Sequence, residues 1–231
     1  TITSFVPPTA TQISVAVANA YKNGATSNVV VAPNTAWGGT NNGPNNTPGQ
    51  DADGEVALDI QVAAAAYFVA TGKPADIQVF WAQDIAPAVQ LAARYGCDVC
   101  SISWGADEAQ WGEVAAQHLE ATVMAAAATG MVVFAASGDN DSSDGGPNAA
   151  NVDLPAAAPH VIGCGGTAKT RFAETVWNDA PGSTHGNGTG GGYSTIFPMP
   201  DWQARPIRSA PRGPGRLVPD VSACASPDTG Y

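Results

Sequence analysis

Short apolar segments alternate with helix-like segments along most of this chain, and that alternation limits the folds it can adopt. Buried strands are predicted at 76–82, 98–103, 131–137 and 160–166. The stretches between them have the length and apolar spacing of helices. Strands that alternate with helices predict βαβ units and hence an α/β fold, with a parallel sheet flanked by helices on both faces.

The helices expected in this pattern cover 54–70, 86–96 and 107–130, the last being one long helix with Gly130 as its C-terminal cap. The first 52 residues are weakly patterned. They predict a short helix over 10–25, a strand over 28–32 stopped by Pro33, and a long polar loop. A length of 231 residues is compatible with one large domain.

The charge balance excludes some classes of protein. Nine Lys and Arg face twenty Asp and Glu, giving a formal net charge of −11 and a pI near 4.3. A nucleic-acid-binding protein needs a cationic surface, so we expect no nucleic-acid partner. A chain with few basic groups gains little positive charge in acid, which suits work at low pH. No segment reaches the 18 to 20 apolar residues of a membrane span, and Thr1 opens no leader-like run.

Glu55 and Asp59 stand four residues apart in the first predicted helix. One turn of helix separates them, so both carboxyls lie on one face and titrate as a coupled pair. Such a pair can accept a proton in acidic solution, where an imidazole is already protonated. By spacing alone, a solvated helix face is the commoner explanation.

Asp139 follows the apolar strand at 131–137 and is preceded by Gly138. A carboxyl at the tip of a buried strand is costly unless it is protonated or hydrogen-bonded. Once protonated, it can donate a hydrogen bond to a developing oxyanion. A turn residue whose carboxylate accepts backbone N–H groups is an equally good explanation.

Other reactive residue types give weaker signals. His118, His160 and His185 do not stand where a catalytic base is expected, and no G-x-S-x-G motif occurs. The single C-x-x-C pair favours buried thiols over a metal site, with the disulfide state undetermined for Cys97, Cys100, Cys164 and Cys224. The glycine run at 188–192 lacks the context of a phosphate loop and indicates either a flexible loop or close backbone packing.

Seven motifs occur in the order that they take in one known family. They are "DGEVALDI", "SISWG", "AASGD", "VDLPAAAPHVIGCGGT", "VWND", "GGGYSTIFPMPDWQ" and "VPDVSACASPDTGY". Over 53–231 the chain resembles the sedolisins, the serine-carboxyl peptidases, and is most similar to the kumamolisin-like members. The resemblance implies a subtilisin-like fold and an acid-acting endopeptidase that hydrolyses protein or peptide substrates.

The resemblance also implies roles for individual residues. Glu55 matches the general base and Asp59 the acid that supports it, while Asp139 matches the oxyanion-hole acid. Trp104 is expected to orient Glu55. Residues 103–105, namely Ser103, Trp104 and Gly105, are expected to line the substrate strand. Asp153 matches a carboxylate at the floor of the S1 pocket, which implies a basic or polar P1 side chain.

One departure from the family pattern is serious. The nucleophilic Ser of a G-T-S segment is expected after Tyr231, and no G-T-S occurs in the sequence. The family's calcium site follows that Ser, so calcium is expected for the complete domain with no ligands in this chain. We therefore expect 1–231 to be one incomplete catalytic domain, with a second polypeptide carrying the rest. Secretion and a propeptide-bearing zymogen follow by the same resemblance.

Two alternatives stay open at this point. The chain can be a catalytically inactive, peptide-binding homologue or fragment that keeps the acids without a nucleophile. It can also be a conventional subtilisin-like hydrolase with its His in an unexpected place, which a flat activity profile around neutral pH would indicate.

Overall fold

The computed structural model describes residues 28–32, 52–80, 82, 84–146, 150–179, 188–204 and 214–229. The chain divides into two compact units, Thr1–Cys97 and Asp98–Tyr231, and each is described by itself. The helix expected over 10–25 lies outside the described residues. The polar loop that was expected next also lies outside the described residues, up to residue 51. The helix that follows begins at Ala52.

The first unit contains one parallel strand pair and two helices. Strand β1 (Asn28–Ala32) pairs in parallel with β2 (Asp76–Phe80), with Val30 opposite Gln78. Helix α2 (Ala52–Thr71) lies between them in sequence, so these elements form the expected βαβ unit. Strand β2 ends at Phe80 and its side chains are exposed or half-buried, whereas the sequence predicted a buried strand to residue 82.

Helix α3 (Ile85–Arg94) follows β2 and packs against it. Its buried residues, Ala86, Val89 and Ala92, recur every three positions and form one apolar face. The Asp84 side chain accepts a hydrogen bond from the backbone N–H of Ala86 at the N-terminus. The predicted helix at 86–96 is therefore confirmed, with its boundaries one or two residues away.

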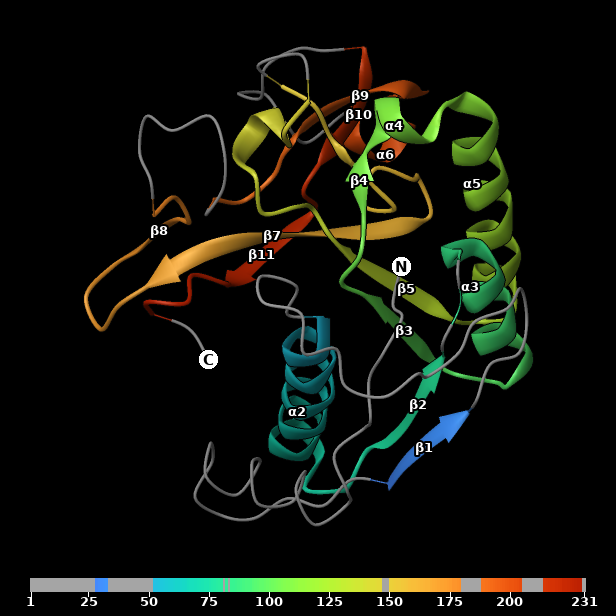
Figure 1. Cartoon of the computed structure of the whole chain (residues 1–231), viewed down its shortest axis with the longest axis vertical. Helices are drawn as coiled ribbons and strands as arrows, with labels where there is room; N and C mark the ends of the chain where they lie inside the picture. Colours follow the sequence, from blue (N-terminus) through green and yellow to red (C-terminus); the bar gives the residue numbers. More distant parts are fainter. Residues whose placement is uncertain are drawn as a thin grey trace. The chain divides into compact units, whose positions relative to one another are not determined.

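The second unit is built on a parallel sheet with the strand order β11–β7–β5–β3 (Figure 1). Its strands are β3 (Val99–Ile102), β5 (Val132–Ala136), β7 (Val161–Lys169) and β11 (Val221–Cys224). The short strand β8 (Glu174–Val176) adds to β7 in antiparallel orientation. Three of the predicted strands thus lie in one sheet, and the predicted α/β class with a parallel sheet is confirmed.

Two helices replace the single long helix predicted over 107–130. Helix α4 (Glu108–Trp111) ends at Gly112, and helix α5 (Glu113–Ala128) begins directly after it. Gly112 has φ 75° and ψ 156°, a backbone conformation that glycine adopts without steric cost and that no helix can contain. The prediction of one helix was wrong because the apolar pattern continues across a glycine that breaks the backbone.

Helix α5 covers part of the sheet through a continuous apolar stripe. Ala116, Leu119, Val123 and Ala126 are almost fully buried and recur at helical spacing, and the helix contacts β5. Side chains on the opposite face, such as Val114 and Met124, are exposed. This stripe fixes which face of α5 meets the sheet.

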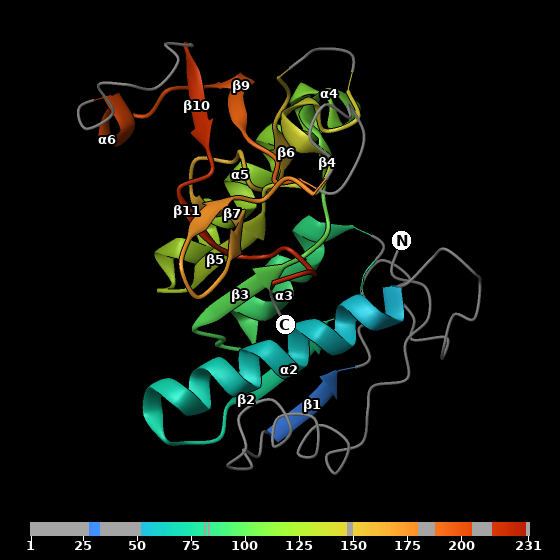
Figure 2. The same ribbon diagram turned by 90° about the vertical axis from the view of Figure 1, so that its left-hand side faces the viewer.

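Two smaller strand pairs complete the unit. Strands β9 (Gly192–Pro198) and β10 (Gly215–Val218) pair antiparallel, and Figure 2 shows them side by side. Strands β4 (Ala106–Asp107) and β6 (Asp153–Leu154) form a two-residue antiparallel ladder. The second ladder brings the segment after β3 to the carboxyl group of Asp153.

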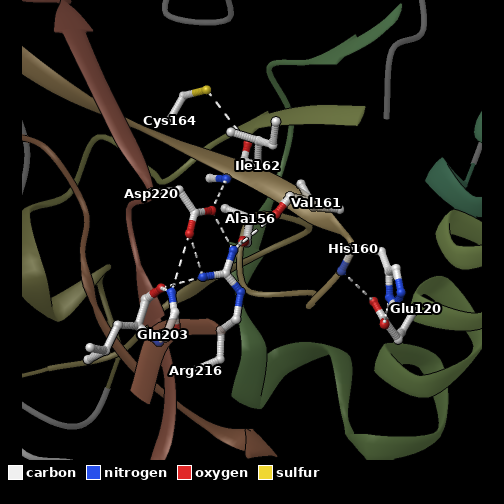
Figure 3. Close-up of polar contacts among 11 residues, drawn as sticks. Glu120, Ala156, His160, Val161, Ile162, Cys164, Gln203, Arg216 and Asp220 are labelled. Carbon is white, nitrogen blue, oxygen red and sulfur yellow. Dashed lines mark hydrogen bonds and ion pairs between the residues drawn. The ribbon is translucent and has the colours of Figure 1, made fainter. Parts of the chain in front are cut away.

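A buried ion pair ties β10 to the main sheet (Figure 3). The Arg216 side chain is fully buried, and its Nη2 lies 2.5 Å from Asp220 Oδ2. Arg216 also donates to the carbonyl oxygens of Val161 and Leu217, while Asp220 Oδ2 accepts from the backbone N–H of Gly163. One charged pair thereby joins β10, the loop before β11 and the start of β7.

Two neighbours complete this network. Gln203, in the short helix α6 (Asp201–Ala204), donates to Leu217 O and Asp220 Oδ1. The Trp202 ring lies 5.1 Å from the Arg216 guanidinium carbon, within the range of a cation–π contact. The Arg216 side chain is therefore buried in this network, and the Asp220 side chain is 15% exposed. Of the buried polar atoms of this pair, only Arg216 Nε has no hydrogen-bond partner among the described residues.

Candidate active site

A pocket of about 230 Å³ lies at the carboxyl ends of the parallel strands of the second unit. Loops leave the sheet at this edge, which is where α/β proteins place their ligands. It is lined by residues at the ends of β3, β5 and β11, in the middle of β7 and just after β8, among them Ser103, Ser137, Gly138, Asp139, Trp177 and Cys224. Two of the sequence-predicted site residues, Ser103 and Asp139, therefore lie in one pocket.

Asp139 lies three residues after the end of β5, and its side chain is accessible to solvent at the pocket. Protein atoms around the carboxyl still desolvate it, which raises its pKa above the ordinary value of 3.8. Desolvation disfavours the charged form, so the proton is held to higher pH than on a free aspartate. The carboxyl can then donate a hydrogen bond in acid.

Two further carboxyls lie behind the turn that carries Asp139. Gly138, with φ 97°, leaves room for them: a Cβ at this position would lie 2.9 Å from Asp144 Oδ1 and 3.2 Å from Asp153 Oδ2. Asp144 is 7% exposed and Asp153 is 6% exposed. A side chain at residue 138 would therefore displace the acids that adjoin the Asp139 turn.

Both buried acids hold their protons strongly. Burial, followed by the charge of Asp144, raises the pKa of Asp153 to about 8. Burial, followed by the charge of Asp107, raises the pKa of Asp144 to about 6. The Asp139 charge contributes to both shifts, so the three carboxyls around Gly138 are coupled.

The segment after β3 packs closely on Asp153. A Cβ at Gly105 would lie 2.5 Å from Asp153 Oδ1 and 2.5 Å from the carbonyl oxygen of Leu154. Only glycine fits this approach, so residue 105 and Asp153 are neighbours. Their roles in binding substrate stay a prediction. Asp153 itself is not among the residues that line the 230 Å³ pocket.

A buried glutamate fixes the other end of this segment. Glu108 is 3% exposed, and its carboxyl accepts hydrogen bonds from Ser194 Oγ, Thr195 N and Thr195 Oγ1 at 2.5 to 2.7 Å. The backbone N–H of Glu108 donates to Val152 O at 2.9 Å. Glu108 therefore joins α4 to β9 and to the residue before β6. Residues 103–107 are thereby fixed by Asp153 at Gly105 and by the bonds of Glu108 at their C-terminal end.

The predicted base pair belongs to the first unit. Glu55 and Asp59 are both in α2, four residues apart and half-buried, and Val56 and Ile60 beside them are buried. The shared helix face predicted for the two acids is confirmed. Their expected meeting with Trp104 and Asp139 joins two units that are described separately, and it stays a prediction.

Two of the three histidines lie within the described residues, and neither lines the pocket. His118 is exposed on α5, and His160 Nδ1 lies 2.5 Å from Glu120 Oε1 just before β7 begins. The start of β7 is the end opposite to the pocket, so His160 links α5 to the sheet. His185 lies outside the described residues.

The cysteines are more accessible than predicted. Cys97, Cys100 and Cys164 are half-buried and Cys224 is exposed, whereas buried thiols were expected. Burial and the Asp220 charge raise the pKa of the Cys164 thiol, so it stays protonated at neutral pH. Both Cys164 and Cys224 line the pocket.

The sequence predicted Asp139 and Asp153 and missed Asp107, Glu108 and Asp144. Asp107, 2% exposed, caps α4 by accepting from the backbone N–H of Ala109 at 3.1 Å. The available signal was local: Asp144 precedes two glycines, and Asp107 and Glu108 start a helix. Their burial depends on strands far away in sequence and could not be read from it.

The described residues offer neither a metal-binding cluster nor a membrane-spanning helix. Across those residues, no three His, Cys, Asp or Glu side chains form a group that could hold a metal ion. The calcium expected for the complete domain stays a prediction. No helix in the described part of the chain is long and apolar enough to cross a membrane.

Comparisons with known proteins agree with this geometry. Residues 31–223 match the family model described as "Subtilase family". Kumamolisin from Bacillus sp. (strain MN-32) is 41% identical over 210 residues, which cover 84% of this chain and 36% of that protein. Human tripeptidyl-peptidase 1 is 31% identical over 142 residues, covering 54% of this chain and 24% of that protein.

A solved structure extends the likeness to nearly the whole chain. Pseudomonas sedolisin, a serine-carboxyl proteinase complexed with two molecules of pseudo-iodotyrostatin, matches with a TM-score of 0.75 and 26% identity. The match covers 98% of this chain and 65% of that one. The chain spans less than two thirds of the length of each of these relatives. It belongs to the subtilase family and, within it, to the sedolisin or kumamolisin-like branch.

Proposed function

We propose that this chain carries the proton-transfer and oxyanion residues of a serine-carboxyl endopeptidase that acts in acid. The observation that carries the proposal is Asp139, an accessible carboxyl with a raised pKa at a pocket where parallel strands end. Likeness to kumamolisin and to Pseudomonas sedolisin supports the reaction class. Substrates would be protein or peptide chains.

The proposed chemistry is acyl transfer. A serine hydroxyl attacks the scissile carbonyl carbon while Glu55 accepts the hydroxyl proton, and Asp59 on the same face of α2 supports Glu55. The carbonyl oxygen becomes negatively charged, and the protonated Asp139 donates a hydrogen bond to it. Return of the proton from Glu55 to the leaving amine releases the first product, and water then hydrolyses the acyl-enzyme.

Substrate would lie along residues 103–105, with Asp153 selecting the P1 side chain. With a pKa of about 8, Asp153 is protonated in acid and can donate a hydrogen bond to a polar side chain. A basic side chain would instead displace the proton and form an ion pair. Both outcomes agree with a basic or polar P1 preference.

The nucleophile must come from outside this sequence, because no G-T-S segment occurs in it. We propose that a further segment or a second polypeptide supplies the serine and the calcium ligands, and that the protein is secreted as a zymogen. Intact-mass measurement of the natural protein tests the two-chain form. A single 23.3 kDa species without a companion would contradict it.

The same missing motif favours one second candidate, a catalytically inactive peptide-binding homologue. Such a protein would bind extended peptides along residues 103–105 and would not react with peptide aldehydes, which trap a nucleophilic serine. Covalent labelling by an aldehyde inhibitor would therefore exclude it.

Activity against a denatured protein substrate tests the main proposal in the full-length natural polypeptide. We expect more activity at pH 4 than at pH 7.5, because Asp139 must keep its proton. Asp139→Asn and Glu55→Gln should each lower kcat by about 10²-fold or more with the fold intact. Higher activity at pH 7.5, or either variant at wild-type activity, would contradict the assignment and favour a conventional subtilisin-like hydrolase.

A further inference from the structure

The segment Gly188–Gly190 is packed tightly within the second unit. Gly188 and Gly190 are buried and Thr189 is half-buried. The sequence left a flexible loop and close backbone packing as alternatives for this glycine run, and the structure supports close packing. The segment adjoins the turn of residues 137–141, called here the Asp139 turn.

Four hydrogen bonds join the segment to the Asp139 turn. The N–H of Gly188 donates to Asp139 O at 3.1 Å, and the N–H of Gly190 donates to Gly138 O at 2.8 Å. In the other direction, the N–H of Asp141 donates to Gly188 O at 3.0 Å. The Ser137 hydroxyl, which is 1% exposed, donates to Gly190 O at 3.0 Å. The turn is thus bonded before, at and after Asp139.

Thr189 joins the segment to the sheet. Its Oγ1 accepts from the N–H of Gly166 in β7 at 2.8 Å, and its own N–H donates to Trp177 O at 3.1 Å. All three backbone N–H groups of the segment therefore have protein acceptors. The segment is arranged to hold the turn against β7, since none of its N–H groups is directed to a ligand.

Glycine is required at both ends of the segment, because no side chain fits there. A Cβ at Gly190 would collide with the carbonyl oxygen of Ser137, and a Cβ at Gly188 would collide with Asp141 Oδ1. Backbone carbonyls cannot move aside without moving the turn. The distance between the Gly188–Gly190 segment and the Asp139 turn therefore depends on glycine at positions 188 and 190.

We propose that Gly188–Gly190 is a positioning element that holds the Asp139 carboxyl at the pocket. The segment fixes the backbone of the turn, and the turn determines how far the carboxyl is withdrawn from water. The acidic groups around the turn are the Asp144 and Asp153 carboxyls, which adjoin Gly138, and the Asp141 carboxyl within the turn, which adjoins Gly188. Only the catalytic meaning of this positioning rests on the proposed function; the positioning itself can be tested without activity.

The test is a ¹³C NMR titration of the Asp139 carboxyl carbon in the full-length natural polypeptide, assigned by its loss in Asp139→Asn. Gly190→Ala moves the turn, so we expect the titration midpoint of the Asp139 carboxyl to fall toward its ordinary value of 3.8. Gly192→Ala in the same glycine run is the control. Its added Cβ meets Asn151 O at 3.3 Å, Val152 Cγ1 at 3.4 Å and Ala150 Cβ at 3.7 Å. All three atoms lie outside the Asp139 turn, so the midpoint should not change.

Two milder variants keep the test valid where Gly190→Ala fails to fold. Ser137→Ala removes the hydroxyl bond to Gly190 O, and Thr189→Val removes the acceptor for Gly166 N, each without a steric clash. Both should lower the midpoint by a smaller amount. A wild-type midpoint in the folded variants would overturn the inference.

Parallel activity assays separate the two proposals. A lowered midpoint with unchanged peptidase activity would leave the positioning role standing and contradict the role of Asp139 in the reaction. An unchanged midpoint, together with an inactive Asp139→Asn enzyme, would support the reaction and overturn the positioning role.

Discussion

Two groups of carboxyls in the second unit are stabilised in opposite ways. Asp220 lies against the guanidinium of Arg216 and accepts further hydrogen bonds from Gln203 and Gly163. Asp144 and Asp153 lie beside Gly138, where the charges that act on them are those of other carboxylates. The first group has a buried cation, and the second is coupled to Asp139.

The difference separates a structural site from a proton-sensitive one. The ion pair of Arg216 and Asp220 joins three segments, and each partner keeps its charge because the other lies beside it. A set of buried acids without a cation stays neutral by retaining protons, so its charge changes with pH. The proton-sensitive group is the one that adjoins Gly138, a residue that lines the pocket.

Removing the cation of the structural group should have the largest effect. Arg216→Met leaves Asp220 largely buried without its partner, which should lower the free energy of unfolding by about 3 to 5 kcal/mol. Urea denaturation of the full-length polypeptide measures this change. Adding Asp220→Asn should restore part of the loss, since the unpaired charge is gone. A loss under about 1 kcal/mol would make this pair no different from a surface pair.

The proton-sensitive group should make stability depend on pH. Folding raises the pKa of Asp153 from 3.8 to about 8 and that of Asp144 to about 6, so the folded state binds protons more tightly. This stabilisation is complete below pH 4 and is lost as pH rises toward 8, by a few kcal/mol on the order-of-magnitude scale of linked protonation. Thermal unfolding of the wild type between pH 4 and 8 measures it.

Asp153→Asn should flatten that profile, because Asn cannot ionise, while the exposed Asp201→Asn serves as the control and should not. If the melting temperature of Asp153→Asn fell as steeply with rising pH as that of the wild type, Asp153 would not be proton-sensitive. The contrast with the Arg216–Asp220 pair would then be lost.

A third buried acid, Glu108, lies between these extremes because neutral donors satisfy it. Glu108→Gln keeps the shape but turns one acceptor into a donor facing Ser194 or Thr195, which should cost about 1 to 3 kcal/mol. Chemical denaturation with and without Ser194→Ala measures the coupling. Additive effects of the two substitutions would show that the hydroxyl and the carboxylate do not interact.

The smallest effect is expected at an exposed pair. Lys169 Nζ lies 3.2 Å from Glu174 Oε2, and both side chains are over 40% exposed. Lys169→Ala should change stability by less than about 1 kcal/mol, and added salt should remove the difference. A change as large as that of Arg216→Met would mean that burial is not what distinguishes these ion pairs.

Elements with a strong local pattern could be predicted from the sequence. The strands at β3, β5 and β7 and the helix at α3 follow from apolar spacing and from glycine after a helix end. The placement of Asp139 follows too, because a polar residue directly after a strand must lie at the carboxyl edge of a parallel sheet.

Features that depend on distant segments could not be predicted. The acceptors of Ser194 and Thr195 lie 86 and 87 residues earlier in the chain, so the burial of Glu108 has no local signal. The break at Gly112 and the packing of Gly190 on Ser137 also depend on tertiary contacts. In each case the sequence shows the type of the residue, but it does not show which residue lies next to it in the folded chain.

Strand β7 has a consequence for which parts of this unit open most slowly. It is hydrogen-bonded along one side to β5 and along the other to β11, with Cys164 opposite both Ala136 and Val221. Amides flanked on both sides are released only when neighbouring strands separate. Deuterium should therefore enter the middle of β7, and of β5 between β7 and β3, more slowly than it enters β3 and β11. The Ser137 N–H, bonded to Cys164 O at 2.9 Å, should share that protection and carry it into the first residue of the Asp139 turn.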